Sequence, residues 1–252
     1  MIDILLSGCN GKMGRVITAC VAEREDCRIA AGIDLNTEPT SDFPVFDSPA
    51  SVSVQADVII DFSNPAAVIP LLDYACAHSI PAVIATTGLS EEQTDAIRKA
   101  SEHIPVFFSA NMSLGVNLLV ELARIATRVL GSSFDIEIVE MHHNQKLDAP
   151  SGTALMIADQ IAEECGRAMH YEYDRHSKRC KREKNEIGIH AVRGGTVVGE
   201  HEILFAGRDE LIKISHSARS KEIFAVGSVN AAVYLHSKPA GLYCMADLVE
   251  GK

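Results

Sequence analysis

The stretch from His142 to Thr153 concentrates side chains that could handle protons and bind an acid. Two imidazoles, His142 and His143, and the amine of Lys146 precede the run 150–153, whose Pro-Ser-Gly-Thr sequence fits the opening of a helix. Histidine titrates near neutral pH, and a lysine ammonium stabilises developing negative charge. Backbone N–H groups at a helix start bind carboxylates or phosphates. The stretch therefore indicates a site for a small acidic substrate.

The residues around this stretch constrain how its side chains point. The run 134–138 alternates apolar and charged residues, which predicts a half-buried strand leading into the site. If the strand continues, His142 and His143 face opposite sides, and one of them meets the substrate directly. Ser151 or Thr153 could cap the following helix, and Asp148 could either orient Lys146 or cap the turn.

The first 34 residues indicate a dinucleotide site. A strand at 2–7 is followed by Gly8-x-x-Gly11-x-x-Gly14, an apolar helical face, a second strand at 27–33 and then Asp34. Gly8 permits the tight turn, Gly11 lets the backbone approach a pyrophosphate, and Gly14 lets the helix pack on the sheet. Asp34 is suited to accept hydrogen bonds from the adenosine ribose, and its charge would repel a 2′-phosphate. Lys12 could partly compensate, but NADH is favoured over NADPH.

Further strands alternate with helices along the first half. Runs at 58–62, 80–85 and 106–108 read as strands, and Ser90-Glu91-Glu92-Gln93 resembles a capping box before a helix. Alternating strands and helices predict a parallel sheet of the Rossmann type, with ligands at the carboxyl ends of the strands. The segments expected at that rim are 8–14, Asp34, 61–63, 86–88 and 109–112.

The second half has a different pattern. A long helix to about residue 130 precedes the central motif, and strand-like runs follow at 187–192, 196–205 and 210–216. The last two are joined by a short turn, which predicts an antiparallel hairpin sheet. The basic stretch 175–184 is interpreted as a solvated loop. A helix near 221–235 is expected to return to the first domain, so the predicted domains are 1–112 with 220–252, and 113–219.

The overall composition excludes several classes of function. The formal charge of −11 over 252 residues argues against nucleic acid as a partner, because no broad cationic surface can offset phosphates. No long apolar run suggests a membrane span, and the start lacks the features of a signal peptide, so a cytoplasmic location is expected. The seven cysteines lack zinc-ligand spacing, so no metal is expected.

Several motifs in this order resemble the 4-hydroxy-tetrahydrodipicolinate reductase (dihydrodipicolinate reductase) family over essentially the whole chain. They are the glycine loop at 8–14, Ala85-Thr86-Thr87-Gly88, Ser109-Ala110-Asn111-Met112-Ser113, the segment 140–153, Arg193-Gly194-Gly195 with 198–201, and Gly241-Leu242-Tyr243. The resemblance implies a Rossmann-type nucleotide-binding domain and an α+β substrate and tetramerisation domain with an open mixed sheet. It also implies closure between the two on ligand binding, a homotetramer, and reduction of a cyclic dicarboxylate by NADH or NADPH in lysine biosynthesis.

The family's site residues transfer to matching positions. His142 and Lys146 are implied to handle protons, and His143 with the Gly152 and Thr153 amides is implied to grip substrate carboxylates. The implied cofactor contacts are Gly8, Cys9, Asn10, Gly11, Lys12, Met13, Asp34, Ala85, Thr86, Thr87, Ser109, Ala110, Asn111 and Met112.

Two departures from the family pattern bear on the cofactor. A glycine usually stands where this chain has Ala85, and many members carry an arginine beside the acid that matches Asp34. Two other functions are considered beside the reductase. A related NAD-dependent amino- or hydroxy-acid dehydrogenase would share the cofactor. A non-catalytic nicotinamide sensor would keep the glycine loop but have no use for the cluster from His142 to Lys146.

Overall fold

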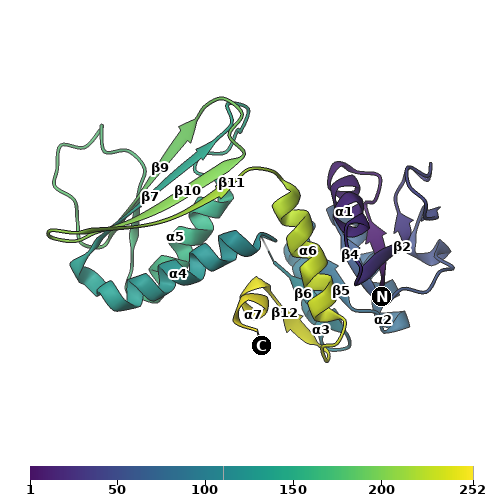
Figure 1. Cartoon of the computed structure of the whole chain (residues 1–252). Helices are drawn as coiled ribbons and strands as arrows, with labels where there is room; N and C mark the ends of the chain where they lie inside the picture. Colours follow the sequence, from purple (N-terminus) through teal and green to yellow (C-terminus); the bar gives the residue numbers. More distant parts are fainter. Residues whose placement is uncertain (110, 252) are drawn as a thin grey trace. The chain divides into compact units, whose positions relative to one another are not determined.

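The computed structural model describes residues 1–109 and 111–251, which divide into two compact units. Unit 1 comprises Met1–Leu114 and Glu222–Lys252, and unit 2 comprises Gly115–Lys221. Figure 1 shows a helix-covered sheet in each unit. Because α6 and the chain's end belong to unit 1, two chain crossings join the units.

Unit 1 is built on a seven-stranded parallel sheet in the order β12-β6-β5-β4-β1-β2-β3. Its strands are β1 (Ile2–Ser7), β2 (Cys27–Ile33), β3 (Val45–Phe46), β4 (Val58–Asp61), β5 (Ala82–Ile84), β6 (Pro105–Phe108) and β12 (Gly241–Tyr243). Its helices are α1 (Lys12–Ala22), the short 3-10 helix η1 (Pro49–Ser51), α2 (Pro65–His78), α3 (Glu91–Ser101), α6 (Glu222–Leu235) and α7 (Met245–Glu250).

Two hydrophobic layers enclose the unit 1 sheet. Side chains of α1, α6 and α7 pack on one face, and those of α2 and α3 pack on the other. The central strand β4 is buried at every position, as a parallel strand covered on both faces must be. The Rossmann-type prediction is confirmed, and so is the capping box, in which Ser90 and Gln93 cap α3 reciprocally. The two edge strands, β3 and β12, were not predicted, because two or three residues show no hydrophobic period.

Unit 2 contains a five-stranded mixed sheet in the order β11-β10-β7-β9-β8. Its elements are α4 (Leu114–Leu130), η2 (Gly131–Ser133), β7 (Asp135–His142), α5 (Gly152–Cys165), β8 (His170–Glu172), β9 (Glu186–Arg193), β10 (Gly199–Ala206) and β11 (Leu211–Ala218). Helices α4 and α5 cover one face of the sheet, where Ile138, Ile203 and Phe205 are buried (Figure 1). The open mixed sheet implied by the resemblance is therefore confirmed.

The antiparallel prediction for the three late strands is only partly correct. The pair β10–β11 is antiparallel, as its short turn requires. Strand β9, however, pairs in parallel with β7, and β7 separates it from β10. Sequential neighbours need not pair, and here an earlier strand lies between them.

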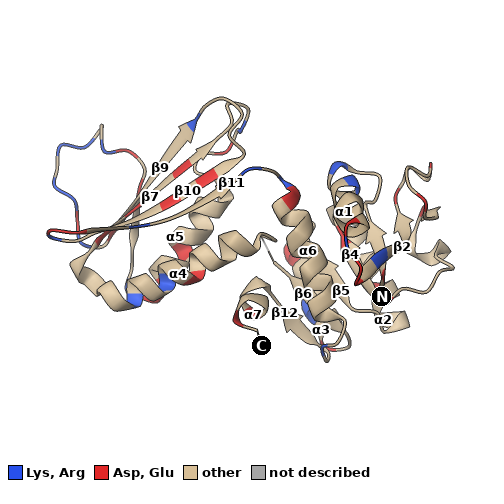
Figure 2. Cartoon of the chain, in the orientation of Figure 1, with Lys and Arg blue, Asp and Glu red and all other residues tan. Residues whose placement is uncertain are grey.

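The basic stretch 175–184 is a loop, but its description as merely solvated is wrong. The loop lies between β8 and β9 and carries basic residues along its length (Figure 2). Arg182 donates to Glu137 Oε1 at 2.9 Å and to the carbonyl of Ile136 at 2.8 Å, while Lys178 pairs with Glu172 and Arg175 with Glu186. Three of its cations therefore tie the loop to the sheet.

None of the helices within residues 1–109 and 111–251 is both long enough and apolar enough to cross a membrane.

Candidate active site

The glycine loop of unit 1 has the backbone geometry of an anion cradle. Gly8 adopts φ +80°, and a Cβ there would lie 2.6 Å from the carbonyl oxygen of Phe62. A Cβ on Gly14 would collide with the carbonyls of Gly8 and Cys9, so α1 packs against the loop only because residue 14 has no side chain. Gly11 is the N-cap of α1, with no side-chain cap and no acid in the first turn. The start of α1 therefore presents backbone N–H groups suited to a phosphate.

Asp34 fixes the shape of this loop from the end of β2. Its Oδ2 accepts a hydrogen bond from the backbone N–H of Asn10 at 3.0 Å, and its Oδ1 accepts from the N–H of Asn36 at 3.1 Å. The Asn10 side chain in turn donates to the carbonyls of Asn36 and Glu38. Asn10 thus holds the segment after β2, a role that the glycine spacing did not predict.

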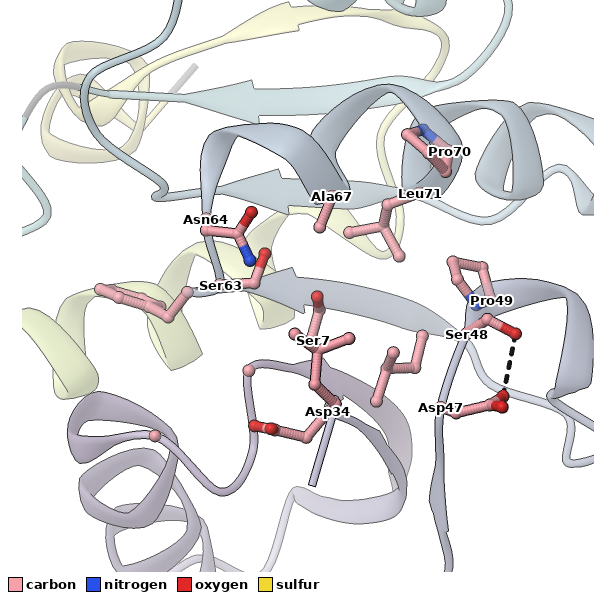
Figure 3. Close-up of a pocket in the computed structure, with 15 residues that line it drawn as sticks. Ser7, Asp34, Asp47, Ser48, Pro49, Ser63, Asn64, Ala67, Pro70 and Leu71 are labelled. Atoms are coloured by element: carbon pink, nitrogen blue, oxygen red, sulfur yellow. Dashed lines mark hydrogen bonds between the residues drawn. The ribbon is translucent and has the colours of Figure 1, made fainter. Parts of the chain in front are cut away.

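A cavity of about 390 Å³ opens between the glycine loop and α2 (Figure 3). Asp34 and Asp47 border it on one side, and residues of α2 border it on the other. The lining contains no lysine or arginine and is made of Ser7, Gly8, Gly11, Ile33, Asp34, Leu35, Asp47, Ser48, Pro49, Phe62, Ser63, Asn64, Ala67, Pro70 and Leu71. Apolar walls with a few carboxylates suit a flat, hydroxylated ligand. Sequence reasoning missed Asp47, Ser48 and Pro49, because their segment carries no motif.

Asp61 organises the carboxyl ends of the central strands. It is completely buried and accepts hydrogen bonds from the hydroxyls of Ser63, at 2.5 Å, and Thr86, at 2.6 Å. Burial raises the pKa of this carboxyl above its usual value, against the opposing effect of these hydroxyls and that of Ser7. Asp61 therefore fixes the side chain of Thr86, a predicted cofactor contact. From the sequence, Asp61 was expected at the rim of the sheet but was given no such role.

The other predicted cofactor residues lie at the ends of β5 and β6. Ala85 and Met112 are buried in the same core, so the Ala85 methyl group faces protein. Thr87 is exposed. Ser109 donates its hydroxyl to the carbonyl of Asn111 at 3.0 Å, and Ala110 lies outside the described residues.

In unit 2, β7 carries the predicted catalytic histidine at its end. The strand buries every second residue, and this row runs from Ile136 and Ile138 to Glu140 and His142. The row is apolar where α4 and α5 cover it and becomes polar at the carboxyl end. His142 Nδ1 lies 2.7 Å from Glu140 Oε2. His143 follows the strand, half-buried, and its carbonyl accepts from the N–H of Lys146 at 3.1 Å.

Arg193 connects these residues to Lys146. Its guanidinium makes a two-pronged pair with the Glu140 carboxylate, 2.7 Å at each oxygen, and donates to the carbonyl of Asp148 at 2.6 Å. The Asp148 side chain holds the Lys146 ammonium at 2.9 Å. The hydrogen bond from Lys146 lowers the pKa of Asp148. Of the two roles open for Asp148, the structure shows the one toward Lys146.

Helix α5 starts directly beside this network. Ser151 is its N-cap and accepts from the N–H of Ala154 at 3.2 Å, which decides between Ser151 and Thr153. The N–H of Ser151 donates to Glu140 Oε1 at 3.0 Å. Gly152 and Thr153 form the first turn, which contains no acid. This end of α5 is suited to a carboxylate.

A second imidazole, His201 on β10, backs the site. Its ring packs edge-on against that of His142 with centroids 5.3 Å apart, and its Nε2 lies 3.1 Å from Ser151 Oγ. Burial, with the neighbouring His142, lowers the pKa of His201 to about 4. His201 is therefore neutral at physiological pH.

Glu140, Arg193 and His201 had no assigned role in the sequence analysis. Glu140 could have been found, because a carboxylate two residues before a histidine on an alternating strand shares its face. Arg193 and His201 join the site only through the pairing of β9 and β10 with β7, which no local pattern reveals.

A glycine-loop dinucleotide fold in one unit, and a histidine, a lysine and a helix start in the other, define the chain as a two-domain oxidoreductase of the nicotinamide-dependent class. Family models agree with this at a finer level. Residues 2–112 match the model described as dihydrodipicolinate reductase, N-terminus, and residues 115–249 match its C-terminus. The chain belongs to the dihydrodipicolinate reductase family.

Individual relatives extend over the full length. The 4-hydroxy-tetrahydrodipicolinate reductase of Caldanaerobacter subterraneus subsp. tengcongensis is 52% identical, with 99% of each chain covered. That of Clostridium tetani is 47% identical, with 97% of this chain and 96% of the relative covered. A dipicolinate-bound dihydrodipicolinate reductase from Paenisporosarcina sp. TG-14 superposes with a TM-score of 0.79 at 28% identity, covering 97% of both chains. The family resemblance seen in the sequence is confirmed.

Proposed function

We propose that this chain reduces 4-hydroxy-tetrahydrodipicolinate to tetrahydrodipicolinate with NADH or NADPH, in the route to diaminopimelate and lysine. The observation that carries the proposal is the network from His142 through Glu140 and Arg193 to Asp148 and Lys146, in a family whose curated members are named for this reaction. The proposed nucleotide-binding domain, residues 1–112 with 220–252, corresponds to unit 1, and the proposed substrate-binding and oligomerisation domain, residues 113–219, corresponds to unit 2, each within two residues. A cytoplasmic homotetramer fits the family.

The chain's own residues divide the chemistry between them. A bound reduced nicotinamide supplies the hydride. His142 and Lys146 supply or hold the proton that balances the charge left on the substrate ring, and the Lys146 ammonium stabilises that charge as it develops. His143 and the N–H groups of Gly152 and Thr153 bind the substrate carboxylates. The dipicolinate bound to the Paenisporosarcina relative is such a dicarboxylate.

The residues of unit 1 fit a dinucleotide. The start of α1 takes the pyrophosphate, with contacts from the loop Gly8–Met13, and Asp34 takes the adenosine ribose. Asp34 and Asp47 both line the cavity, and no cation there offsets a 2′-phosphate. We therefore expect NADH to be the preferred cofactor, and we expect Thr86, Thr87, Ser109, Asn111 and Met112 to contact its nicotinamide end.

The direct test is coupled turnover, with the substrate generated in place from pyruvate and aspartate semialdehyde and NADH oxidation followed by absorbance. Lys146→Ala is expected to lower kcat by about 100-fold with little change in the KM for NADH. Lys213→Ala is the matched control. Lys213, on β11 of the unit 2 sheet, also pairs with one carboxylate, that of Glu202 on β10, at 3.2 Å. NADH binding without turnover would support the nicotinamide sensor, and turnover of amino or hydroxy acids alone would support the related dehydrogenase.

Cofactor preference has its own test. Asp34→Ala is expected to lower the ratio of kcat/KM for NADH to that for NADPH by about tenfold, which corresponds to about 1.4 kcal/mol. The ratio is the appropriate readout, because loss of the Asn10 and Asn36 hydrogen bonds disturbs the loop for both cofactors alike. A ratio unchanged from wild type would remove Asp34 from discrimination.

A further inference from the structure

Glu140 is a completely buried carboxylate next to the proposed proton-handling histidine. It lies two residues before His142 on β7, so both side chains point to the face of the sheet that α4 and α5 cover. A buried charge persists only when it is paired and hydrogen-bonded. The partners of Glu140 therefore indicate why the sequence keeps a charge there.

Four hydrogen bonds converge on the two oxygens of Glu140. Oε1 accepts from Arg193 Nη2 at 2.7 Å and from the N–H of Ser151 at 3.0 Å. Oε2 accepts from Arg193 Nη1 at 2.7 Å and lies 2.7 Å from His142 Nδ1. Burial by itself raises the pKa of Glu140, but the hydrogen bonds from Arg193, His142 and Ser151 outweigh burial and leave the pKa below its usual value. Glu140 is therefore an ionised carboxylate that only accepts hydrogen bonds.

This arrangement decides which nitrogen of His142 carries the proton. An ionised carboxylate cannot donate, so the 2.7 Å contact requires the hydrogen to be on Nδ1. The neutral ring then has a lone pair on Nε2. That nitrogen faces Gly199 of β10, where a Cβ would lie 3.2 Å away. Within residues 1–109 and 111–251, no side chain is seen to hydrogen-bond Nε2.

We propose that Glu140 is a positioning residue for the reduction: held by Arg193 and by the backbone N–H of Ser151, the N-cap of α5, it keeps His142 in the Nδ1–H tautomer and directs Nε2 to the substrate. Nε2 is then the atom that carries the proton to the substrate, and Glu140 stabilises the imidazolium that exists before the transfer. The proposal rests on the role of His142 given under Proposed function.

The same strand provides a matched control. Glu137 also accepts hydrogen bonds from one arginine, Arg182 Nε at 2.9 Å, and lies 2.8 Å from one histidine nitrogen, His190 Nε2. Its pKa is likewise lowered, because Arg182 and His190 outweigh its burial. Glu137 points to the other face of the sheet, so Glu137→Gln removes an equivalent charge without touching His142.

The first measurement is the tautomer of His142, read from the ¹⁵N shifts of both ring nitrogens in the full-length protein without ligands. It is made at a pH well above the ordinary titration range of histidine, and the signals are assigned by their loss in His142→Gln. The expected result is a hydrogen on Nδ1 in wild type and in Glu137→Gln, and a mixture of tautomers in Glu140→Gln, whose amide can donate as well as accept. A hydrogen on Nε2 in wild type would overturn the proposal, even if no Glu140 variant folds.

The second measurement is steady-state kinetics of the two variants. Glu140→Gln is expected to lower kcat at least about tenfold and to leave the KM for NADH within about twofold, while Glu137→Gln changes neither. Wild-type kcat in Glu140→Gln, or equal losses in both variants, would overturn the positioning role. If the wild-type protein itself fails to turn over the substrate, the proposed function fails, and the tautomer measurement still decides what Glu140 does to His142.

Discussion

Strand β7 carries two carboxylates, Glu137 and Glu140, that each pair with one arginine and one histidine. The two groups differ in their burial and in which nitrogen of the histidine ring the carboxylate contacts. Glu137 lies 2.8 Å from His190 Nε2 on the face of the sheet opposite α4 and α5, and Glu140 lies 2.7 Å from His142 Nδ1 on the face that these helices cover. The glutamate of the first group is about one-fifth exposed, while that of the second is completely buried. By residue types alone the two groups would be equal candidates for a catalytic site, since each contains one glutamate, one arginine and one histidine.

The difference shows how geometry separates a structural ion-pair group from a proton-handling one. Arg182, by donating to Glu137 and to the Ile136 carbonyl, attaches the loop between β8 and β9 to the sheet. Arg193 uses Glu140 to join His142, the start of α5 and the carbonyl of Asp148. The Glu140 group lies beside the N-terminus of α5 and Lys146, both of which can bind an acidic substrate. The Glu137 group contacts neither of them in the part of the chain that the structure describes.

The largest stability difference is expected between the two arginines. Arg193→Met leaves the Glu140 carboxylate buried without its cation and is expected to lower the free energy of unfolding by about 3–5 kcal/mol. Arg182→Met leaves carboxylates that are 21% and 43% exposed, and the expected loss is about 1–2 kcal/mol. Urea unfolding measures both. Equal losses would mean that burial does not distinguish the two groups.

The pH dependence of stability comes next. The folded pKa of His201 is about 4, below the value of 6.5 for the free side chain, so between these values the unfolded chain binds a proton that the folded chain does not. The contribution of His201 is therefore present above pH 6.5 and is lost as the pH falls toward 4, by up to roughly 3 kcal/mol. His201→Gln should make the free energy of unfolding depend less steeply on pH over this range. An unchanged slope in His201→Gln would contradict a neutral, buried ring.

The smallest effects are expected at two glycines that face the two groups. A Cβ at Gly199 would crowd His142 Nε2 at 3.2 Å, so Gly199→Ala should lower kcat about threefold to tenfold by displacing the ring. A Cβ at Gly188 would collide with the Glu137 carboxylate, which Arg182 and His190 hold, so Gly188→Ala should leave kcat unchanged and lower the free energy of unfolding by about 1–2 kcal/mol. Kinetics and thermal melting of both variants separate these outcomes. A loss of kcat in Gly188→Ala would show that the group around Glu137 also matters to turnover.

The share of the fold and of the site that could be predicted from the sequence differs between the two units. In unit 1, strand, glycine turn, helix and acid are local patterns, so the parallel sheet and the roles of Gly8 and Gly14 follow from spacing and are seen in the structure. The edge strands β3 and β12 carry too few residues for any period. Asp47 reaches the cavity only because β3 pairs with β2.

In unit 2 the sequence showed the motif at 142–153 but not the residues of other strands that hold it in place. The end of β7 and the Ser151 cap follow from alternation and capping preference. Arg193 and His201 reach His142 from β9 and β10 through strand pairings that depend on long-range packing. The same long-range pairing made β9 parallel to β7, against the hairpin-based expectation.

The most direct test of the account is the turnover rate of His142→Ala beside His190→Ala in the coupled assay with NADH. The account predicts that His142→Ala loses at least about 100-fold in kcat while His190→Ala stays within about twofold of wild type. A His142→Ala enzyme that keeps wild-type kcat would contradict it, because the proton would then come from a group other than the imidazole that Glu140 holds.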